Sequence, residues 1–160
     1  MSSPRPKIQS RRALREIAHR YRKAGKRIVF TNGCFDLFHV GHVTYLEKAK
    51  SLGDILVVGL NSDASVRQIK GPERPLTPEK DRLRVLAALE VVDYVTLFSE
   101  KTPLDLIREI KPHVLVKGAD WKRGEIVGAR EVESWGGRVK RIPLVPGRST
   151  TALLRKIQDR

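Results

Sequence analysis

A short apolar strand is joined to a helix by the stretch Thr31-Asn32-Gly33-Cys34-Phe35-Asp36-Leu37-Phe38-His39-Val40-Gly41-His42, and this junction indicates the class of fold. Residues 27–31, which lead into it, are apolar and rich in Val and Ile, as in a buried strand. Residues 41–52, which follow it, place Val43, Leu46 and Ala49 on one helical face. The stretch is therefore expected to be a strand-to-helix junction.

The same alternation of strand and helix continues along the chain. Four more short apolar strands are predicted, at residues 55–60, 94–98, 114–117 and 138–142. Helical patterns are predicted at residues 11–24, 78–89 and 103–110, before Gly136, and after Ser149. We therefore expect an α/β, Rossmann-like fold: a doubly wound five-stranded parallel sheet with helices on both faces. Residues 67–78 lack periodicity and are expected to form a functional loop.

Length and composition indicate a folded chain with one site. The 160 residues are 40% hydrophobic and 31% charged, which argues against a disordered or membrane-embedded protein. No apolar run approaches the roughly 20 residues that span a bilayer, and no secretory signal follows the amino terminus. A cytoplasmic location is expected. The lone Cys34 cannot form an internal disulfide, and we expect a small buried thiol in preference to a nucleophile.

The formal net charge of +14 is concentrated before the first strand. Residues 1–27 hold ten Lys and Arg against one acid, Glu16. Apolar residues recur there at helical spacing, which predicts a surface helix with a basic outer face: Leu14, Ile17, Ala18 and Tyr21. We expect a basic N-terminal helical segment, 1–25, followed by one domain, 26–160. A solvated face is the favoured interpretation of the charge, and a nucleic-acid-binding module is the alternative, with binding that falls steeply with salt.

The strand-to-helix junction is a candidate phosphate site. In open α/β sheets, ligands collect beyond the carboxyl ends of the strands, and a helix amino terminus offers free N–H groups to an anion. His39 and His42 can face one bound group, and each imidazole can donate a hydrogen bond to a phosphate oxygen. Gly41 between them lets the backbone approach the ligand. A capping role would explain a single histidine, whereas the pair favours function, and no neighbouring residues complete a zinc site.

Further motifs follow in order: Val-Gly-Leu-Asn-Ser-Asp at 58–63, Lys-Gly-Pro-Glu-Arg-Pro at 70–75, Val-Lys-Gly-Ala-Asp-Trp at 116–121 and Ser-Thr-Thr at 149–151. Together with the first stretch they resemble the cytidylyltransferase-like nucleotidyltransferases, and more narrowly the heptose 1-phosphate adenylyltransferases. The resemblance covers nearly the whole chain from Lys26 onward. It implies transfer of AMP from ATP to a heptose 1-phosphate, which gives ADP-heptose and pyrophosphate, with Mg²⁺ bound to the triphosphate and no metal ligand from the protein.

The resemblance also implies a role for each motif. Four side chains would act on the phosphates by positional and electrostatic catalysis: His39, His42, Lys70 and Arg82. The nucleotide would be bound by Thr31, Asn32, Gly33, Phe35, Gly41, Lys117, Gly118, Asp120, Trp121, Ser149, Thr150 and Thr151. The acceptor side of the site would include Asp36, Asn61 and Asp63.

Two residues depart from the family pattern, and one of them, Trp121, leaves the substrates open. Arg148 stands where related sequences carry an apolar residue or cysteine, and Trp121 stands where many heptose enzymes carry Tyr. Trp121 brings its motif closer to the glycerol 3-phosphate cytidylyltransferases, so a cytidylyltransferase acting on glycerol 3-phosphate or a related polyol or alcohol phosphate is the alternative. Asn32, Cys34 and the Lys-Gly-x-x-Arg-Pro loop favour the heptose family.

The resemblance finally implies the partners. ATP and a phosphorylated sugar are expected, with no membrane and no nucleic acid, in a homo-oligomer for which a dimer is favoured. The kinase domain often fused to this family is absent from the sequence, so the protein is expected to act as a separate polypeptide.

Overall fold

The computed structural model describes residues 6–160, so the first five residues of the expected basic segment lie outside the description. Its centre is a five-stranded sheet in the order β3-β2-β1-β4-β5, and every neighbouring pair is parallel. The strands are β1 (Ile28–Gly33), β2 (Ile55–Asn61), β3 (Tyr94–Phe98), β4 (Val114–Gly118) and β5 (Arg138–Ile142). The predicted α/β fold is confirmed, and all five strands lie where the sequence predicts them, with ends that differ by at most two residues.

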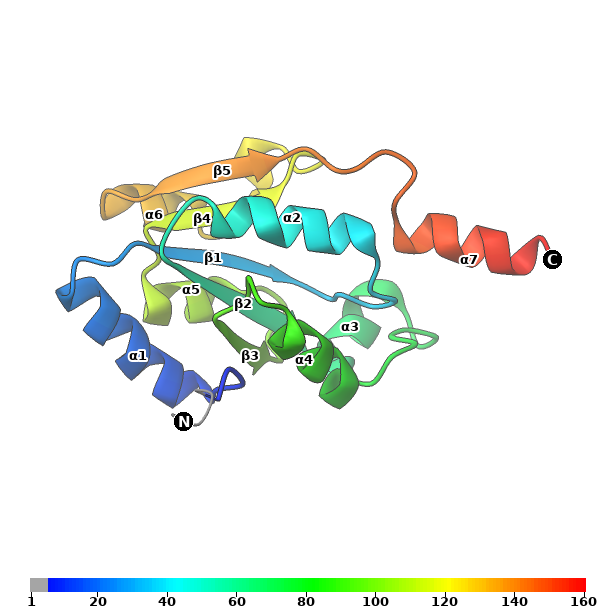
Figure 1. Ribbon diagram of the computed structural model, residues 1–160, viewed down its shortest axis with the longest axis horizontal. Coiled ribbons are helices and arrows are strands. Elements are labelled where there is room, and N and C mark those ends of the chain that lie inside the picture. The colour runs from blue at the N-terminus through cyan, green and yellow to red at the C-terminus, as the bar shows by residue number, and fades with distance from the viewer. Residues whose placement is uncertain (1–5) are drawn as a thin grey trace.

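Helices cover both faces of this sheet (Figure 1). One face carries α1 (Arg11–Lys23), α5 (Leu104–Ile110) and α6 (Ala129–Ser134), and the other carries α2 (Val40–Lys50) and α4 (Glu79–Ala88). Side chains alternate along β1 as a strand buried on both faces requires: Ile28 and Phe30 pack with the first group, and Val29 packs with the second. The two core layers are thus filled by the periodic apolar residues that predict the elements.

The stretch 67–78 is shorter as a loop than the sequence predicts. Helix α3 (Asp63–Lys70) includes its first four residues, so the expected loop is wrong at that end. Ser62 caps α3 by accepting a hydrogen bond from the Ser65 N–H, and Val66, in the middle of the helix, is fully buried. The irregular part begins at Gly71, which has a φ of 98° and ends the helix.

Helix α1 packs against the core. Leu14 and Ala18 are buried, and Ile17 and Tyr21 pack beside them, as their spacing predicts. Arg11 forms ion pairs with Glu100, which follows β3, and with Glu109, which lies in α5. Within residues 6–160, no helix has both the length and the hydropathy needed to cross a bilayer.

The connections between the strands predict a ligand site at the carboxyl end of β1. The chain leaves β1 toward β2 and returns to the other side of β1 as β4, so the direction of winding reverses between these two strands. Ligands in open α/β sheets bind at the carboxyl ends of such strands. Helix α7 (Thr150–Gln158) brings its amino terminus to this edge and then extends away from the sheet, with no buried residue of its own (Figure 1).

Candidate active site

The two histidines form a reciprocal cap on α2. His39 is the N-cap residue, and its Nδ1 accepts a hydrogen bond from the Gly41 N–H at 3.1 Å. The Nδ1 of His42 accepts from the His39 N–H at 3.2 Å, and the two rings stack with centroids 3.8 Å apart. Because each Nδ1 is an acceptor, each neutral ring must carry its proton on Nε2. The backbone therefore leaves both rings with an Nε2–H donor for a ligand.

Both histidines are held in the neutral form. Burial, followed by the nearby His39 ring and the Lys70 ammonium, lowers the pKa of His42 to about 4. Burial also lowers the pKa of His39. At neutral pH the pair thus offers two hydrogen-bond donors without carrying positive charge, and the cations at the site come from other side chains.

These rings line a cavity of about 380 Å³, which we call the histidine pocket. The cavity brings together most of the residues that the motifs predict: Asn32, Gly33, Phe35, Asp36, His39, Gly41, His42, Lys70, Lys117, Gly118, Asp120, Trp121, Ser149 and Thr150. Its wall also contains Tyr45, Leu144 and Val145, which no motif predicts, and Arg148, which departs from the family pattern. These segments come from the ends of β1, β4 and α3 and from the starts of α2 and α7.

Gly41 is required here for close packing. A Cβ on this residue would lie 2.8 Å from the Arg148 carbonyl oxygen and 2.8 Å from Cε1 of His39. The segment before α7 therefore sits directly against the first turn of α2. Ser149 caps α7 by accepting from the Ala152 N–H, so the free N–H groups of α7 begin beside the histidines.

A second cavity of about 800 Å³, the lateral pocket, opens next to the first. The two cavities share six residues: Asn32, Gly33, Cys34, Lys70, Lys117 and Trp121. The lateral pocket adds the predicted Asn61 and seven residues that no motif predicts: Gln68, Ile69, Lys101, Thr102, Pro103, Ile126 and Val127. Two ligands could therefore lie side by side and meet at the shared wall.

Lys117 stands at this shared wall. The residue is half-buried, and its ammonium lies 5.5 Å from the centre of the Trp121 ring. Burial lowers the pKa of Lys117 to about 8, although Cys34 and Asp120 act in the opposite direction. The expected burial of Cys34 is wrong, because its side chain is only half-buried and lines both cavities.

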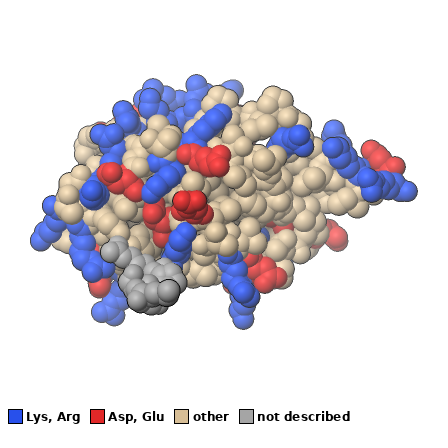
Figure 2. All heavy atoms as spheres, in the orientation of Figure 1, with Lys and Arg blue, Asp and Glu red and all other residues tan. Residues whose placement is uncertain are grey.

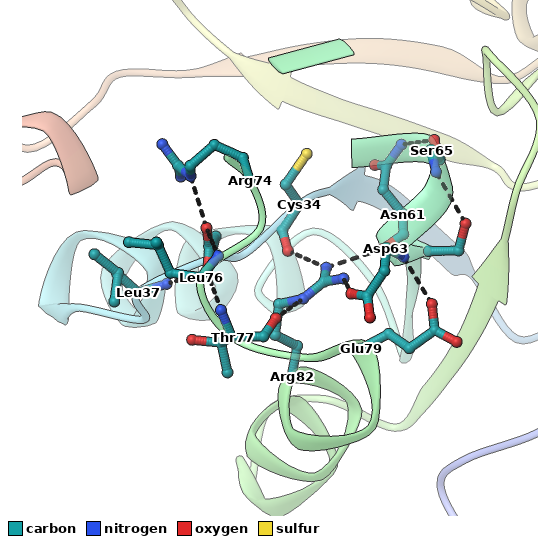
Figure 3. Close-up of polar contacts among 12 residues, drawn as sticks. Cys34, Leu37, Asn61, Asp63, Ser65, Arg74, Leu76, Thr77, Glu79 and Arg82 are labelled. Atoms are coloured by element: carbon teal, nitrogen blue, oxygen red, sulfur yellow. Dashed lines mark hydrogen bonds and ion pairs between the residues drawn. The ribbon is translucent and has the colours of Figure 1, made fainter. Parts of the chain in front are cut away.

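Four predicted site residues line neither cavity: Thr31, Asp63, Arg82 and Thr151. Arg82 is 2% exposed, and Figure 3 shows its guanidinium surrounded by protein acceptors. Nε donates to the Thr77 carbonyl, and Nη1 donates to the carbonyls of Cys34 and Asn61. Nη2 forms an ion pair with Asp63 at 2.7 Å. Arg82 and Asp63 therefore lie behind the wall and hold together the ends of β1 and β2.

Thr31 and Thr151 also lie outside the walls of the two cavities. Thr31 is buried, its Oγ1 donates to the Val116 carbonyl, and the same oxygen lies 2.7 Å from the Tyr45 hydroxyl. A hydroxyl has one proton, so Tyr45 is the donor to Thr31. Thr151 is exposed on α7. Among residues 6–160, no three His, Cys, Asp or Glu side chains cluster in a way that could hold a metal ion.

Comparisons with known proteins identify the family of the chain. The profile of the family described as cytidylyltransferase-like matches residues 30–153. The chain is 56% identical over 154 residues to the Bifunctional protein HldE of Syntrophotalea carbinolica, and 60% identical over 137 residues to that of Methylobacillus flagellatus. These matches cover 96% and 86% of the chain but 31% and 28% of the relatives, so the chain spans about a third of their length.

Two solved structures share the fold. One is the lipopolysaccharide core biosynthesis protein of Thermoplasma volcanium, with 32% identity and a TM-score of 0.63, over 76% of this chain and 98% of that one. The other is the pantoate-beta-alanine ligase of Francisella tularensis, with 16% identity and a TM-score of 0.62, over 85% and 66% of the two chains, and it supports the fold alone. The chain belongs to the cytidylyltransferase-like family, and the predicted class of nucleotidyltransferase is confirmed.

Proposed function

We propose that the protein transfers AMP from ATP to a heptose 1-phosphate and releases pyrophosphate. The observation that carries the proposal is the pair of adjoining cavities, which meet at Asn32, Lys70 and Lys117 beside the two Nε2–H donors. A nucleotide in the histidine pocket and a sugar phosphate in the lateral pocket would bring their phosphates to this wall. Holding two reactants in contact is itself a large part of catalysis of this kind.

The chemistry at the wall is an in-line displacement. An oxygen of the acceptor phosphate forms a bond to the α-phosphorus of ATP, and the bond from that phosphorus to the bridging oxygen of pyrophosphate breaks. We assign His39 and His42 to donate hydrogen bonds to the oxygens on which negative charge increases. Lys70 and Lys117 would attract the phosphates, and the free N–H groups at the start of α7 would hold the β- and γ-phosphates. No covalent enzyme intermediate is needed.

A divalent metal is consistent with the family, and we propose Mg²⁺. The carboxylate of Asp36 is already bonded to four donors, and Asp120 is the other carboxylate on the wall of the histidine pocket. The metal would thus be held mainly by triphosphate oxygens and would supply charge neutralisation when bound. Removal of divalent ions with EDTA should abolish turnover, and added Mg²⁺ should restore it. Full turnover in EDTA would contradict this assignment.

The heptose acceptor rests on the motifs and on one relative. Asn32, Cys34 and the loop from Lys70 to Pro75 favour the heptose family over glycerol 3-phosphate cytidylyltransferases. The similarity to the lipopolysaccharide core biosynthesis protein of Thermoplasma volcanium is consistent with an acceptor of the sugar phosphate class. A cytoplasmic location and a homodimer remain predictions.

A pyrophosphate-release assay tests the substrates directly. ATP, CTP, GTP and UTP would each be combined with a panel of sugar 1-phosphates and polyol phosphates. We expect release with ATP and a heptose 1-phosphate and much less with CTP and glycerol 3-phosphate. Preference for the second pair would establish the alternative activity, and no release with any pair would overturn the proposed function.

A further inference from the structure

Asp36 lines the histidine pocket, and its carboxylate is saturated by protein donors, most of them from the loop that follows α3. Figure 3 shows three of these residues, Arg74, Leu76 and Thr77, along that loop. The side chain is only 1% exposed. Its two oxygens accept hydrogen bonds at 2.9 to 3.1 Å from the N–H groups of Leu37, Leu76 and Thr77 and from Nε of Arg74. Burial alone would raise the pKa of Asp36, but these donors outweigh it and hold the pKa below its usual value. The carboxylate is therefore ionised at neutral pH and has little capacity left for a substrate.

The backbone of Asp36 makes a second connection. Its carbonyl oxygen accepts a hydrogen bond at 3.0 Å from the Thr150 hydroxyl, in the first turn of α7. This contact matters because α7 has no buried residue that would fix it to the sheet. One residue thus binds the loop 71–78 through its side chain and the start of α7 through its main chain.

We propose that Asp36 is a positioning residue, which clasps the loop 71–78 and the start of α7 against the histidine turn. Lys70 directly precedes the loop, Ser149 and Thr150 begin α7, and all three line the histidine pocket. The clasp therefore fixes the positions of Lys70 and of the amino terminus of α7 relative to the two histidines. This inference rests on the proposed function, because the group that these elements would hold together is the triphosphate.

The test uses Asp36→Asn and Arg74→Gln in the full chain. The Asn amide replaces one acceptor oxygen with an NH2 group, which cannot accept from the backbone N–H groups. We expect hydrogen exchange of residues 71–78 to be about 10-fold faster in the ligand-free protein. Displacement of phosphate-binding groups should raise the Kd and KM for Mg·ATP by about 10- to 100-fold, with a smaller change in the KM of the acceptor. Arg74→Lys, which keeps the positive charge, should recover part of the affinity.

A matched control is present at the opposite edge of the sheet. Asp93 also accepts from a backbone N–H, that of Leu56, and forms an ion pair with Lys50 at 2.6 Å. Asp93→Asn should lower the thermal stability but leave loop exchange and Mg·ATP affinity unchanged. Equal losses of affinity and loop protection in the Asp93 and Asp36 variants would overturn the positioning role.

A further variant tests the contact of Asp36 with α7 separately from its contacts with the loop 71–78. It also keeps the proposal testable if Asp36→Asn does not fold. Thr150→Val removes the contact with α7 and should raise the Kd for Mg·ATP while the loop 71–78 stays protected. An unchanged Kd in both Thr150→Val and Arg74→Gln would refute the clasp. Hydrogen exchange and Mg·ATP binding are measured without turnover. If the wild-type protein showed no AMP transfer, the proposed function would be overturned, but these two measurements would still test the clasp.

Discussion

The histidine pair can be tested at the scale of one ring. His42→Ala removes an Nε2–H donor aimed into the histidine pocket, and it also removes the cap on the His39 N–H. If that donor acts on the charge that develops in the transition state, kcat should fall by about 10²-fold or more. The measurement is steady-state pyrophosphate release at saturating substrates, with a melting curve to show that the variant is folded. A folded variant with the wild-type kcat would remove His42 from the mechanism.

The pKa of Lys117 predicts how the affinity for ATP depends on pH. Its pKa of about 8 means that the side chain is a cation below pH 8 and becomes neutral above it. The affinity for ATP should therefore fall as the pH rises through 8, with a midpoint moved upward to the extent that bound phosphate stabilises the ammonium. Calorimetric titration of ATP between about pH 6.5 and pH 9.5 measures this. Lys117→Arg keeps a charge at every pH in that range and should remove this part of the dependence.

The sequence predicts the motif residues of the site better than their individual roles. His39, His42, Lys70 and Ser149 lie together because each marks the end or start of a regular element at one edge of the sheet. The guanidinium of Arg82 is bound by one carboxylate and three carbonyl groups, and all of these except the nearby Thr77 carbonyl come from distant segments. No local pattern reveals that they surround it. The same limit applies to Lys101, which enters the lateral pocket from a connection without a motif.

Among the elements, the sequence patterns predict the strands and most helices, including the short α5 and α6, but they miss α3. Only Ser65 and Val66 of the eight residues of α3 are buried, so the helix has no extended apolar stripe, and it ends at Gly71. Its start has a readable signal, because Ser62 and Asp63 are an N-cap residue and a first-turn acid. Capping residues would therefore have located α3 where periodicity could not.

Helix α1 provides the test at this scale. Leu14 is fully buried between α1 and the sheet, in the same cluster as Ile28 and Phe30. Leu14→Ala should lower the free energy of unfolding by about 2 to 5 kcal/mol, the range for deleting a buried leucine side chain. Urea unfolding followed by circular dichroism measures the loss, and Arg15→Ala, on the exposed face of the same helix, is the control. A loss below about 1 kcal/mol for Leu14→Ala would mean that α1 is not part of the folded core.

For the molecule as a whole, a test of the excess positive charge must leave intact the hydrophobic core to which α1 contributes. Figure 2 shows Lys and Arg side chains over much of one face, including the end where α1 lies, with Asp and Glu among them. Deleting the basic segment would remove Leu14 and Ala18 from the core as well as its charges, so truncation would confuse folding with binding. Substitutions on the exposed face avoid this problem.

Arg15, Arg20 and Lys23 are exposed on α1, and replacing all three with Gln removes charge without touching the buried side. If this face is simply solvated, the variant should keep the wild-type turnover, and each substitution should change stability by no more than about 0.5 kcal/mol. A nucleic-acid site would behave differently, because phosphate contacts release counterions and make the affinity depend steeply on salt. The measurement is binding of a fluorescent DNA duplex and of a single-stranded RNA across a salt series, for the wild type and the triple variant. Tight wild-type binding whose salt dependence weakens in the variant would show that α1 carries a second function, and lost turnover in a folded variant would place its charges in the path of the anionic substrates.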